Sequence, residues 1–317
     1  MSERLTSKEV VVEGHGGAKI LLALGDSFEL MAAMAPGSVS VICCSPPYNL
    51  SVKYEAFNDS RSREDYLVWS KAWLGLAFKA LSAQGHLFLN MGAKPSDPYG
   101  PDEVLQVAKE CGWRLQNKIH WVKSVTVKVA TKPELIAEAA AKTGLSASDT
   151  AELKRAFREI EGDGLERTFG HFKPLNTSRY LNDCYEPVFH LTKTGDVDID
   201  RKAIGAPYED KTNIARWGHT GGENKRCRGN VWAIAYETIQ SRDAERASHP
   251  ATFPVELAEM CLKLAGGSEK VALAMDPFAG TGTTAVACAK LGINCLAVEL
   301  GPKAFFEAVR RCRAAVK

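Results

Sequence analysis

The chain has 317 residues, of which 45% are hydrophobic and 25% are charged, and its formal net charge at pH 7 is +2. This composition is typical of a globular protein with one large domain carrying an insertion, or with two smaller domains. No apolar run approaches the roughly 18 residues of a membrane helix, and the weakly basic charge permits a nucleic-acid partner without requiring one.

Short apolar runs alternate with helical patterns in the first third of the chain. Strands are predicted at residues 18–26, 38–45, 85–92 and 115–123. Helices are predicted where apolar residues recur three and four positions apart, at residues 28–37, 65–81 and 104–113. This alternation predicts a parallel sheet with helices on both of its faces.

The middle of the chain, roughly residues 124–248, interrupts the alternation. Residues 133–161 favour two helices around a stop at Gly144, and stretches rich in glycine, asparagine and arginine follow them. We interpret residues 124–228 as an insertion between two halves of one α/β core, formed by residues 1–123 and 229–317.

The last third returns to the pattern of the first. Strands are predicted at residues 270–278 and 293–300, and helices at residues 254–265, 282–292 and 302–316. The nine cysteines show neither a C-x-x-C pair nor a cysteine–histidine cluster at zinc spacing. We therefore expect reduced cysteines and no metal site. The charged N-terminal segment lacks the apolar core of a signal peptide, so we expect a cytoplasmic protein.

Residues 276–284, with the sequence DPFAGTGTT, lie between a predicted strand and a predicted helix. Glycines there let the backbone approach a ligand, and the start of the helix offers unpaired N–H groups. The missing lysine disfavours a phosphate-binding Walker loop, and the missing third glycine disfavours a dinucleotide site. S-Adenosylmethionine, which has no phosphate, fits best, and Glu299 at the end of the next strand would accept its ribose hydroxyls. A tight turn without any ligand is the alternative.

A second motif, Ser45-Pro46-Pro47-Tyr48, directly follows a predicted strand. Two prolines remove two N–H donors and stiffen the chain, while their carbonyls remain able to accept hydrogen bonds. Ser45 adds an acceptor, and Tyr48 offers a flat face to a planar ring. The motif therefore favours a pocket for the amino group of an aromatic heterocycle, although the tetrapeptide alone could be a surface turn.

The pairing of SPPY with DPFAGTGTT resembles the amino-methyltransferases of DNA, which methylate N4 of cytosine or N6 of adenine. SPPY precedes the glycine loop, an order that resembles the β group of that family, and the resemblance covers roughly residues 20–123 and 229–317. It implies a Rossmann-like methyltransferase fold, with a mostly parallel, doubly wound sheet. The resemblance does not extend to the details of the insertion, which we expect from its predicted helices and its clusters of basic residues to be a partly helical target-recognition domain.

The resemblance implies a cofactor site for S-adenosylmethionine, with Asp26 at the adenine, Glu299 at the ribose and Asp276 near the methionine end. Asp26 could instead cap a helix, and His249 could be structural. The implied cofactor residues are Asp26, His249, Phe253, Pro254, Asp276, Pro277, Phe278, Gly280, Thr281, Gly282, Thr283, Thr284 and Glu299.

The resemblance also implies a mechanism. Hydrogen bonds from the two amino protons to Ser45 and to the Pro46 carbonyl would localise the nitrogen lone pair, which then attacks the sulfonium methyl group in line. The proton would leave to water, because a serine hydroxyl is a poor base. The target base must flip out of the duplex and would stack on Tyr48. Serine at the first motif position favours cytosine N4, and adenine N6 is the alternative.

Basic residues collect in the middle of the chain, which favours contacts with double-stranded DNA. The candidates are Lys123, Lys128, Arg216, Lys225, Arg226 and Arg228. The polar segment that follows SPPY could be either a mobile loop that closes over DNA or a solvated loop. A homodimer and a cognate restriction endonuclease are both left open.

Three other functions remain as alternatives: a methyltransferase acting on RNA or on a protein glutamine, a DNA-binding regulator with an inactive fold, and an NAD-dependent oxidoreductase. The motif order disfavours the glutamine enzymes, the intact motifs disfavour the regulator, and the missing glycine disfavours the oxidoreductase.

Overall fold

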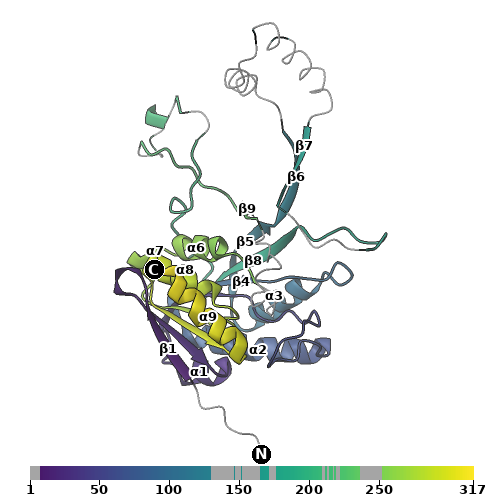
Figure 1. Ribbon diagram of the computed structural model, residues 1–317, viewed down its shortest axis with the longest axis vertical. Coiled ribbons are helices and arrows are strands. Elements are labelled where there is room, and N and C mark those ends of the chain that lie inside the picture. Colours follow the sequence, from purple (N-terminus) through teal and green to yellow (C-terminus); the bar gives the residue numbers. More distant parts are fainter. Residues whose placement is uncertain are drawn as a thin grey trace, which may run out of the picture.

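The structure is a computed structural model that describes residues 8–129, 146, 151, 165–170, 176–208, 211–212, 214–216, 218, 222–235 and 252–317. In this part of the chain, one sheet has the strand order β1-β2-β11-β10-β3-β4-β8-β5-β9 (Figure 1). Its strands are β1 (Lys8–Glu13), β2 (Lys19–Leu24), β3 (Val39–Cys44), β4 (Leu81–Asn90), β5 (Arg114–Val122), β8 (Tyr185–Thr192), β9 (Val231–Ala233), β10 (Ala274–Asp276) and β11 (Cys295–Glu299).

Strands β2, β11, β10, β3 and β4 run parallel to one another. Strand β8 is antiparallel to both of its neighbours, β4 and β5, and β1 is antiparallel to β2 at one edge. The predicted mostly parallel, doubly wound sheet is therefore confirmed. Strands β1 and β8 were not predicted, and β8 lies inside the range 124–228 that we interpreted as an insertion.

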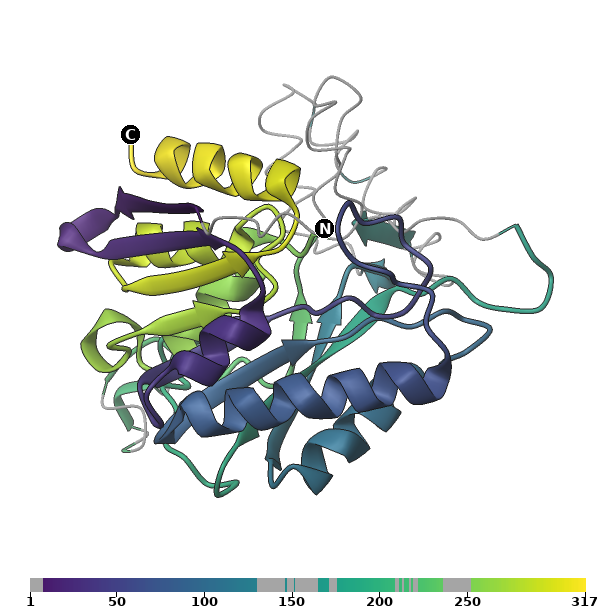
Figure 2. The ribbon, with the colours of Figure 1, turned by 90° about the horizontal axis from the view of Figure 1, so that it is seen from below.

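Helices cover both faces of the sheet (Figure 2). Helices α1 (Ser27–Ala33), α2 (Arg63–Ala80) and α3 (Gly100–Glu110) pack on one face, around the buried Trp73 and Trp113. Helices α6 (Val255–Leu264), α8 (Thr283–Leu291) and α9 (Pro302–Ala315) pack on the other face, and α7 (Gly267–Lys270) is one short turn after α6. Helix α8 is buried from Thr283 to Ala289, which explains its almost uniformly small, apolar sequence.

Beyond β5, the strands β6 (Ser124–Val129) and β7 (Leu165–Gly170) form a separate antiparallel pair that extends away from the sheet (Figure 1). The helices predicted at residues 133–161 lie outside the described residues, apart from isolated positions. No helix in the described ranges has the length and apolarity to cross a membrane. All nine cysteines are free thiols.

Two histidines form a buried pair within the sheet. Nδ1 of His86, on β4, lies 3.0 Å from Nε2 of His190, on β8. The Asn117 side-chain amide lies 2.9 Å from Nδ1 of His190, and the His190 ring stacks on Phe88. If this amide donates, His190 carries its proton on Nε2 and passes a hydrogen bond to His86, so both rings are neutral. Burial, the largest cause, lowers the pKa of His86 to about 4 and the pKa of His190 to about 3.

This pair makes stability depend on pH. Both pKa values lie below the ordinary value of 6.5, so the stabilisation is fully present above pH 6.5 and is lost as the pH falls toward 4 for His86 and toward 3 for His190. Each histidine should contribute a slope of roughly 1 kcal/mol per pH unit in that window. We expect the free energy of unfolding, measured by urea denaturation at several pH values, to fall less steeply with decreasing pH in the variant His86→Asn/His190→Asn than in the wild type. Equal slopes in the two proteins would contradict the expectation.

Candidate functional site

A cavity of about 650 Å³ lies at the carboxyl ends of the parallel strands β2, β3, β10 and β11. Its volume is within the range of small-molecule sites. Both predicted motifs reach it, because Ser45 and Gly280 line the same cavity. The predicted site residues that line it are Asp26, Ser45, Pro47, Phe253, Pro277, Phe278, Gly280, Thr281, Thr283 and Glu299.

The glycine loop connects β10 with α8 through two residues in the left-handed region. Gly280 has φ +52° and Gly282 has φ +78°, values that favour glycine. The backbone N–H of Gly280 donates to Oε2 of Glu299 at 2.7 Å, and the N–H of Gly301 donates to Oε1 at 2.7 Å. Glu299 thus ties its own strand end to the glycine loop while lining the cavity.

The two carboxylates predicted for the cofactor site have different positions. Burial raises the pKa of Glu299, which lines the cavity. Asp276 is buried and does not line the cavity, and its Oδ1 accepts a hydrogen bond of 3.0 Å from the N–H of Phe278. Burial, the largest cause, raises the pKa of Asp276 to about 7. Asp276 therefore stabilises the loop from outside the cavity lining, whereas Glu299 is exposed to the space where a ligand fits.

Three other predicted loop residues form hydrogen bonds within the protein, and two of them, Thr281 and Thr283, also line the cavity. The Thr284 hydroxyl donates to the carbonyl of Cys43 on β3 at 3.1 Å, so the loop is fixed to the strand that carries SPPY. Arg311, on α9, donates to the Thr281 hydroxyl at 2.7 Å and to the Thr283 hydroxyl at 3.2 Å. Arg311 was not predicted, because in the sequence it is one of several basic residues near the end of a helix.

Gly282 packs against α9 and does not line the cavity. A Cβ atom at this position would lie 2.7 Å from the Cβ of Ala308, in addition to the strain of φ +78°. We expect Gly282→Ala to lower the free energy of unfolding by about 3 kcal/mol in urea denaturation, since overpacking costs about 1–3 kcal/mol and the positive φ about 1 kcal/mol more.

Gly17→Ala is the matched control for this substitution. Gly17 has φ +79°, but no atom lies within 4 Å of its Cβ position, so the control isolates the backbone term. We expect a loss of about 1 kcal/mol there. Equal losses of unfolding free energy in Gly282→Ala and Gly17→Ala would show that α9 can move away from the added methyl group without destabilising the protein.

The remaining predicted cofactor residues are split between the cavity and the helix ends. Asp26 lines the cavity and also caps α1, because its Oδ1 accepts a hydrogen bond of 2.8 Å from the N–H of Phe28. Phe253 lines the cavity, and Pro254 is the buried N-cap of α6. His249 lies outside the described residues.

The SPPY motif is held from below by a tyrosine of α2. The Tyr66 hydroxyl donates to the Pro47 carbonyl at 2.9 Å, and the ring of Tyr66 is buried. Ser45 and Pro47 line the cavity, whereas Pro46 is buried and is not among the lining residues. One of the two proline carbonyls is thus used inside the protein. Tyr66 was not predicted, because it appears in the sequence only as one apolar position of a helix.

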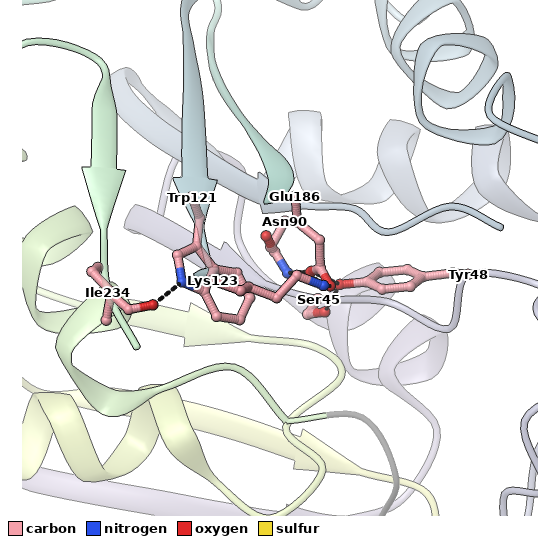
Figure 3. A network of polar contacts seen from close by, with 7 residues as sticks. All are labelled: Ser45, Tyr48, Asn90, Trp121, Lys123, Glu186 and Ile234. Carbon is pink, nitrogen blue, oxygen red and sulfur yellow. Dashed lines mark hydrogen bonds and ion pairs between the residues drawn. The ribbon is translucent and has the colours of Figure 1, made fainter. Parts of the chain in front are cut away.

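Tyr48 lies away from the cavity lining and belongs to a polar network (Figure 3). Its hydroxyl lies 2.5 Å from Oγ of Ser45, and the Asn90 side-chain amide donates to it at 2.7 Å. Its ring lies directly against Gly92, where a Cβ would lie 2.7 Å from the ring. Burial, the largest cause, raises the pKa of Tyr48. In this arrangement Tyr48 supports Ser45, and the stacking role that we predicted for its ring stays a prediction.

The segment after SPPY is folded around a buried aspartate. Asp59 accepts hydrogen bonds of 2.8 to 3.0 Å from the backbone N–H groups of Asn49, Leu50 and Val52. Asn49 adopts φ +61°, a conformation that asparagine tolerates. Residues 53–58 line the cavity as a result. The segment is therefore one wall of the site.

Aromatic rings from this segment, from α2 and from the glycine loop lie together in the lining. The ring centroids of Trp69 and Phe278 are 5.5 Å apart, and those of Trp69 and Phe57 are 5.1 Å apart. The Arg61 guanidinium lies 4.8 Å from the Phe57 ring centroid. Flat apolar walls with acids at the rim suit a nucleoside-like ligand. Lining residues that were not predicted include Lys53, Tyr54, Glu55, Phe57, Arg61, Trp69, Gly301 and Lys303.

The predicted DNA-contacting residues occupy several environments. Arg216, Lys225 and Arg226 are exposed, Arg228 donates through Nε to the Ile204 carbonyl at 2.9 Å, and the side chain of Lys128 lies outside the described residues. Lys123 does not lie on an open surface. Its Nζ is 2.7 Å from Oε1 of Glu186, and the two side chains are 15% and 16% exposed. Lys123 therefore takes part in the network beneath SPPY.

A family model described as DNA methylase, of the N6/N4 type, matches residues 39–310. The type II methyltransferase M.ScaI of Streptomyces caespitosus is 25% identical over 285 residues, which cover 89% of this chain and 77% of that protein. The type II methyltransferase M.MjaVI of Methanocaldococcus jannaschii is 34% identical over 121 residues, covering 36% of this chain and 60% of that protein.

Solved structures share the fold. The PvuII DNA methyltransferase, named cytosine-N4-specific, aligns with a TM-score of 0.58 and 17% identity, over 92% of this chain and 85% of that one. A DNA modification methylase of Thermus thermophilus, solved in complex with S-adenosyl-L-methionine, aligns with a TM-score of 0.54 and 20% identity, over 92% and 93% of the two chains.

Proposed function

The chain belongs to the family of N6/N4 DNA methylases, and from that premise we propose that it methylates N4 of a flipped cytosine in duplex DNA. The methyl donor is S-adenosyl-L-methionine. The observation that carries the proposal is the shared cavity of Ser45 and Gly280, because an acceptor for an amino group and a cofactor loop must meet for direct methyl transfer.

Several residues fit this donor. Glu299 lines the cavity, and a carboxylate has more lone pairs than the backbone N–H groups that it accepts here, which supports a role in accepting a ribose hydroxyl. The rings of Phe278 and Trp69 suit the adenine, and Asp26 lies at the same rim. When bound, S-adenosylmethionine supplies an electrophilic methyl group on a positively charged sulfur.

The protein prepares the amino group that receives the methyl. An exocyclic nitrogen is a weak nucleophile because its lone pair is delocalised into the ring. Ser45 Oγ accepts one amino hydrogen and the Pro46 carbonyl accepts the other, which favours a pyramidal nitrogen. Positioning carries most of the rate enhancement, and the proton leaves to water.

Serine at the first position of the motif supports cytosine as the target, because family members with serine there are mostly cytosine-N4 enzymes. Adenine N6 is the second candidate, since both bases present the same kind of amino group. The relatives named type II methyltransferases support a role in restriction and modification. The exposed Arg216, Lys225 and Arg226 support DNA reading by the middle of the chain. A homodimer, a partner endonuclease and a cytoplasmic location stay predictions.

One experiment tests both the methyltransferase activity and the choice of base. The protein is incubated with unmethylated plasmid DNA and S-adenosylmethionine labelled on the methyl group, and the DNA is digested to nucleosides. We expect labelled N4-methylcytosine. Labelled N6-methyladenine would overturn the choice of base, and a protein that binds the cofactor but leaves DNA unlabelled would overturn the activity.

A further inference from the structure

A chain of hydrogen bonds runs from the cavity into the protein beneath SPPY (Figure 3). It begins at Ser45, which lines the cavity, and passes to the Tyr48 hydroxyl at 2.5 Å. From there it reaches Oε2 of Glu186 on β8 at 3.3 Å. Lys123, at the end of β5, pairs with the other carboxylate oxygen of Glu186 at 2.7 Å. The chain thus joins a residue at the reacting edge to a half-buried ion pair.

Counting donors and acceptors assigns a direction to this chain of hydrogen bonds. The Glu186 carboxylate, which forms an ion pair with Lys123, can only accept, so we direct the Tyr48 proton at Glu186. The Asn90 amide donates to the Tyr48 oxygen and to Oε2 of Glu186, both at 2.7 Å. Either oxygen could donate in the contact between Ser45 and Tyr48. With the one Tyr48 proton directed at Glu186, we assign the Ser45 hydroxyl as the donor to Tyr48. The lone pairs of Ser45 then remain for the cavity.

We propose that Glu186 is a positioning residue that makes Ser45 a hydrogen-bond acceptor toward the cavity, and so selects an amino group over a carbonyl oxygen in the target base. The inference rests on the proposed function and deepens it. Without the Glu186 carboxylate at the inner end of the chain of hydrogen bonds, the Ser45 hydroxyl could point its proton toward the cavity. It would then favour the C4 oxygen of uracil or thymine over the amino group of cytosine.

The surroundings keep the chain in this arrangement. Asn90 is 4% exposed and directs its amide nitrogen at both partners, while the missing side chain of Gly92 leaves room for the Tyr48 ring. Lys123 also lies 5.7 Å from the Trp121 ring centroid, and Trp121 donates through Nε1 to the Ile234 carbonyl at 2.9 Å. The ion pair is therefore held by the sheet itself.

Glu186→Gln tests the proposal, because glutamine has nearly the same shape but offers an N–H to Tyr48. We expect the single-turnover rate of methyl transfer to plasmid DNA to fall at least tenfold, with the Kd for S-adenosylmethionine unchanged within twofold in calorimetry. The double variant Lys123→Met/Glu186→Gln restores the charge balance but not the direction of the hydrogen bonds from Ser45 through Tyr48. It should therefore stay as slow as Glu186→Gln. Recovery of the wild-type rate in the double variant would overturn the proposal, because charge balance alone would then explain the loss.

Base selectivity is a measurement that would not change if Glu186 had only a structural role. In the complex with S-adenosylhomocysteine, the wild type should bind a duplex carrying the mapped target cytosine more tightly than the same duplex with uracil at that position. The ratio of the two Kd values should fall at least fivefold in Glu186→Gln. An unchanged ratio would overturn the proposal even if the rate falls.

Glu110→Gln is the matched control, since Glu110 forms an exposed ion pair with Lys71 and should keep the wild-type rate. If Glu186→Gln fails to fold, Tyr48→Phe breaks the same chain and should lower the selectivity ratio equally, while an unchanged ratio there would refute the inference. An inactive wild type would refute the proposed function and this inference together. An active wild type matched by an equally active and selective Glu186→Gln protein would refute the inference alone.

Discussion

Replacement of Glu299 by alanine is expected to weaken S-adenosylmethionine binding at least 100-fold. Glu299 both faces the cavity and accepts the backbone N–H groups of Gly280 and Gly301, so its loss removes acceptors for the ribose and loosens the loop that shapes the site. A hydrogen bond to a charged group contributes about 1.5–3 kcal/mol, and about 1.4 kcal/mol corresponds to a tenfold change in Kd. Calorimetric titration of the variant with S-adenosylmethionine gives the Kd directly.

Glu269→Ala is the control, because Glu269 is an exposed residue of α7 outside the cavity lining, and it should bind as the wild type does. Thermal melting of both variants shows whether the fold is intact. A folded Glu299→Ala protein that binds within threefold of the wild type would remove Glu299 from the cofactor site.

The parallel part of the sheet could be predicted because its strands are buried on both faces and alternate with amphipathic helices. Residues 38–45 and 293–300 are examples, since each is a largely apolar run with a polar residue, Ser45 or Glu299, at or next to its end and in the cavity lining. The meeting of SPPY with the glycine loop followed from the same rule, because the carboxyl ends of parallel strands share one edge.

Strand β8 could not be predicted in this way. It is an antiparallel strand contributed by the middle of the chain, with Pro187 inside it, and nothing local shows that it inserts between β4 and β5. Glu186 was missed for that reason, and Lys123 was interpreted as a DNA contact although it pairs with Glu186. Only tertiary pairing brings these two residues together, and a single sequence does not contain that information.

Asn90 was predictable in its position but not in its hydrogen-bond partners. It lies near the end of the strand predicted at residues 85–92, beside the strand that carries SPPY, so a polar residue at that sheet edge was a visible signal. Its partners were not visible, because Tyr48 turns away from the cavity lining toward Gly92. A motif can therefore identify the residues of a site while leaving open which of them face the ligand.

Ser45→Ala is expected to lower the single-turnover rate of methyl transfer about 100-fold and to leave the Kd for S-adenosylmethionine unchanged. Ser45 lines the cavity at the end of β3, and its Oγ is placed to accept an amino hydrogen of the target base. Loss of one oriented hydrogen-bonding group at a reacting centre costs about 10²–10³ in rate. Labelled methyl transfer to plasmid DNA, with cofactor and DNA both saturating, measures the effect.

Ser40→Ala is the matched control, because Ser40 lies on the same strand but at its other end, where its hydroxyl accepts the N–H of Ala272 at 3.2 Å. It should keep the wild-type rate. The residual activity of Ser45→Ala should also keep the wild-type dependence on pH, since a serine that only accepts a hydrogen bond removes no titrating base. A Ser45→Ala protein with full activity would show that the Pro46 carbonyl alone orients the amine, and the role assigned to Ser45 would then be lost.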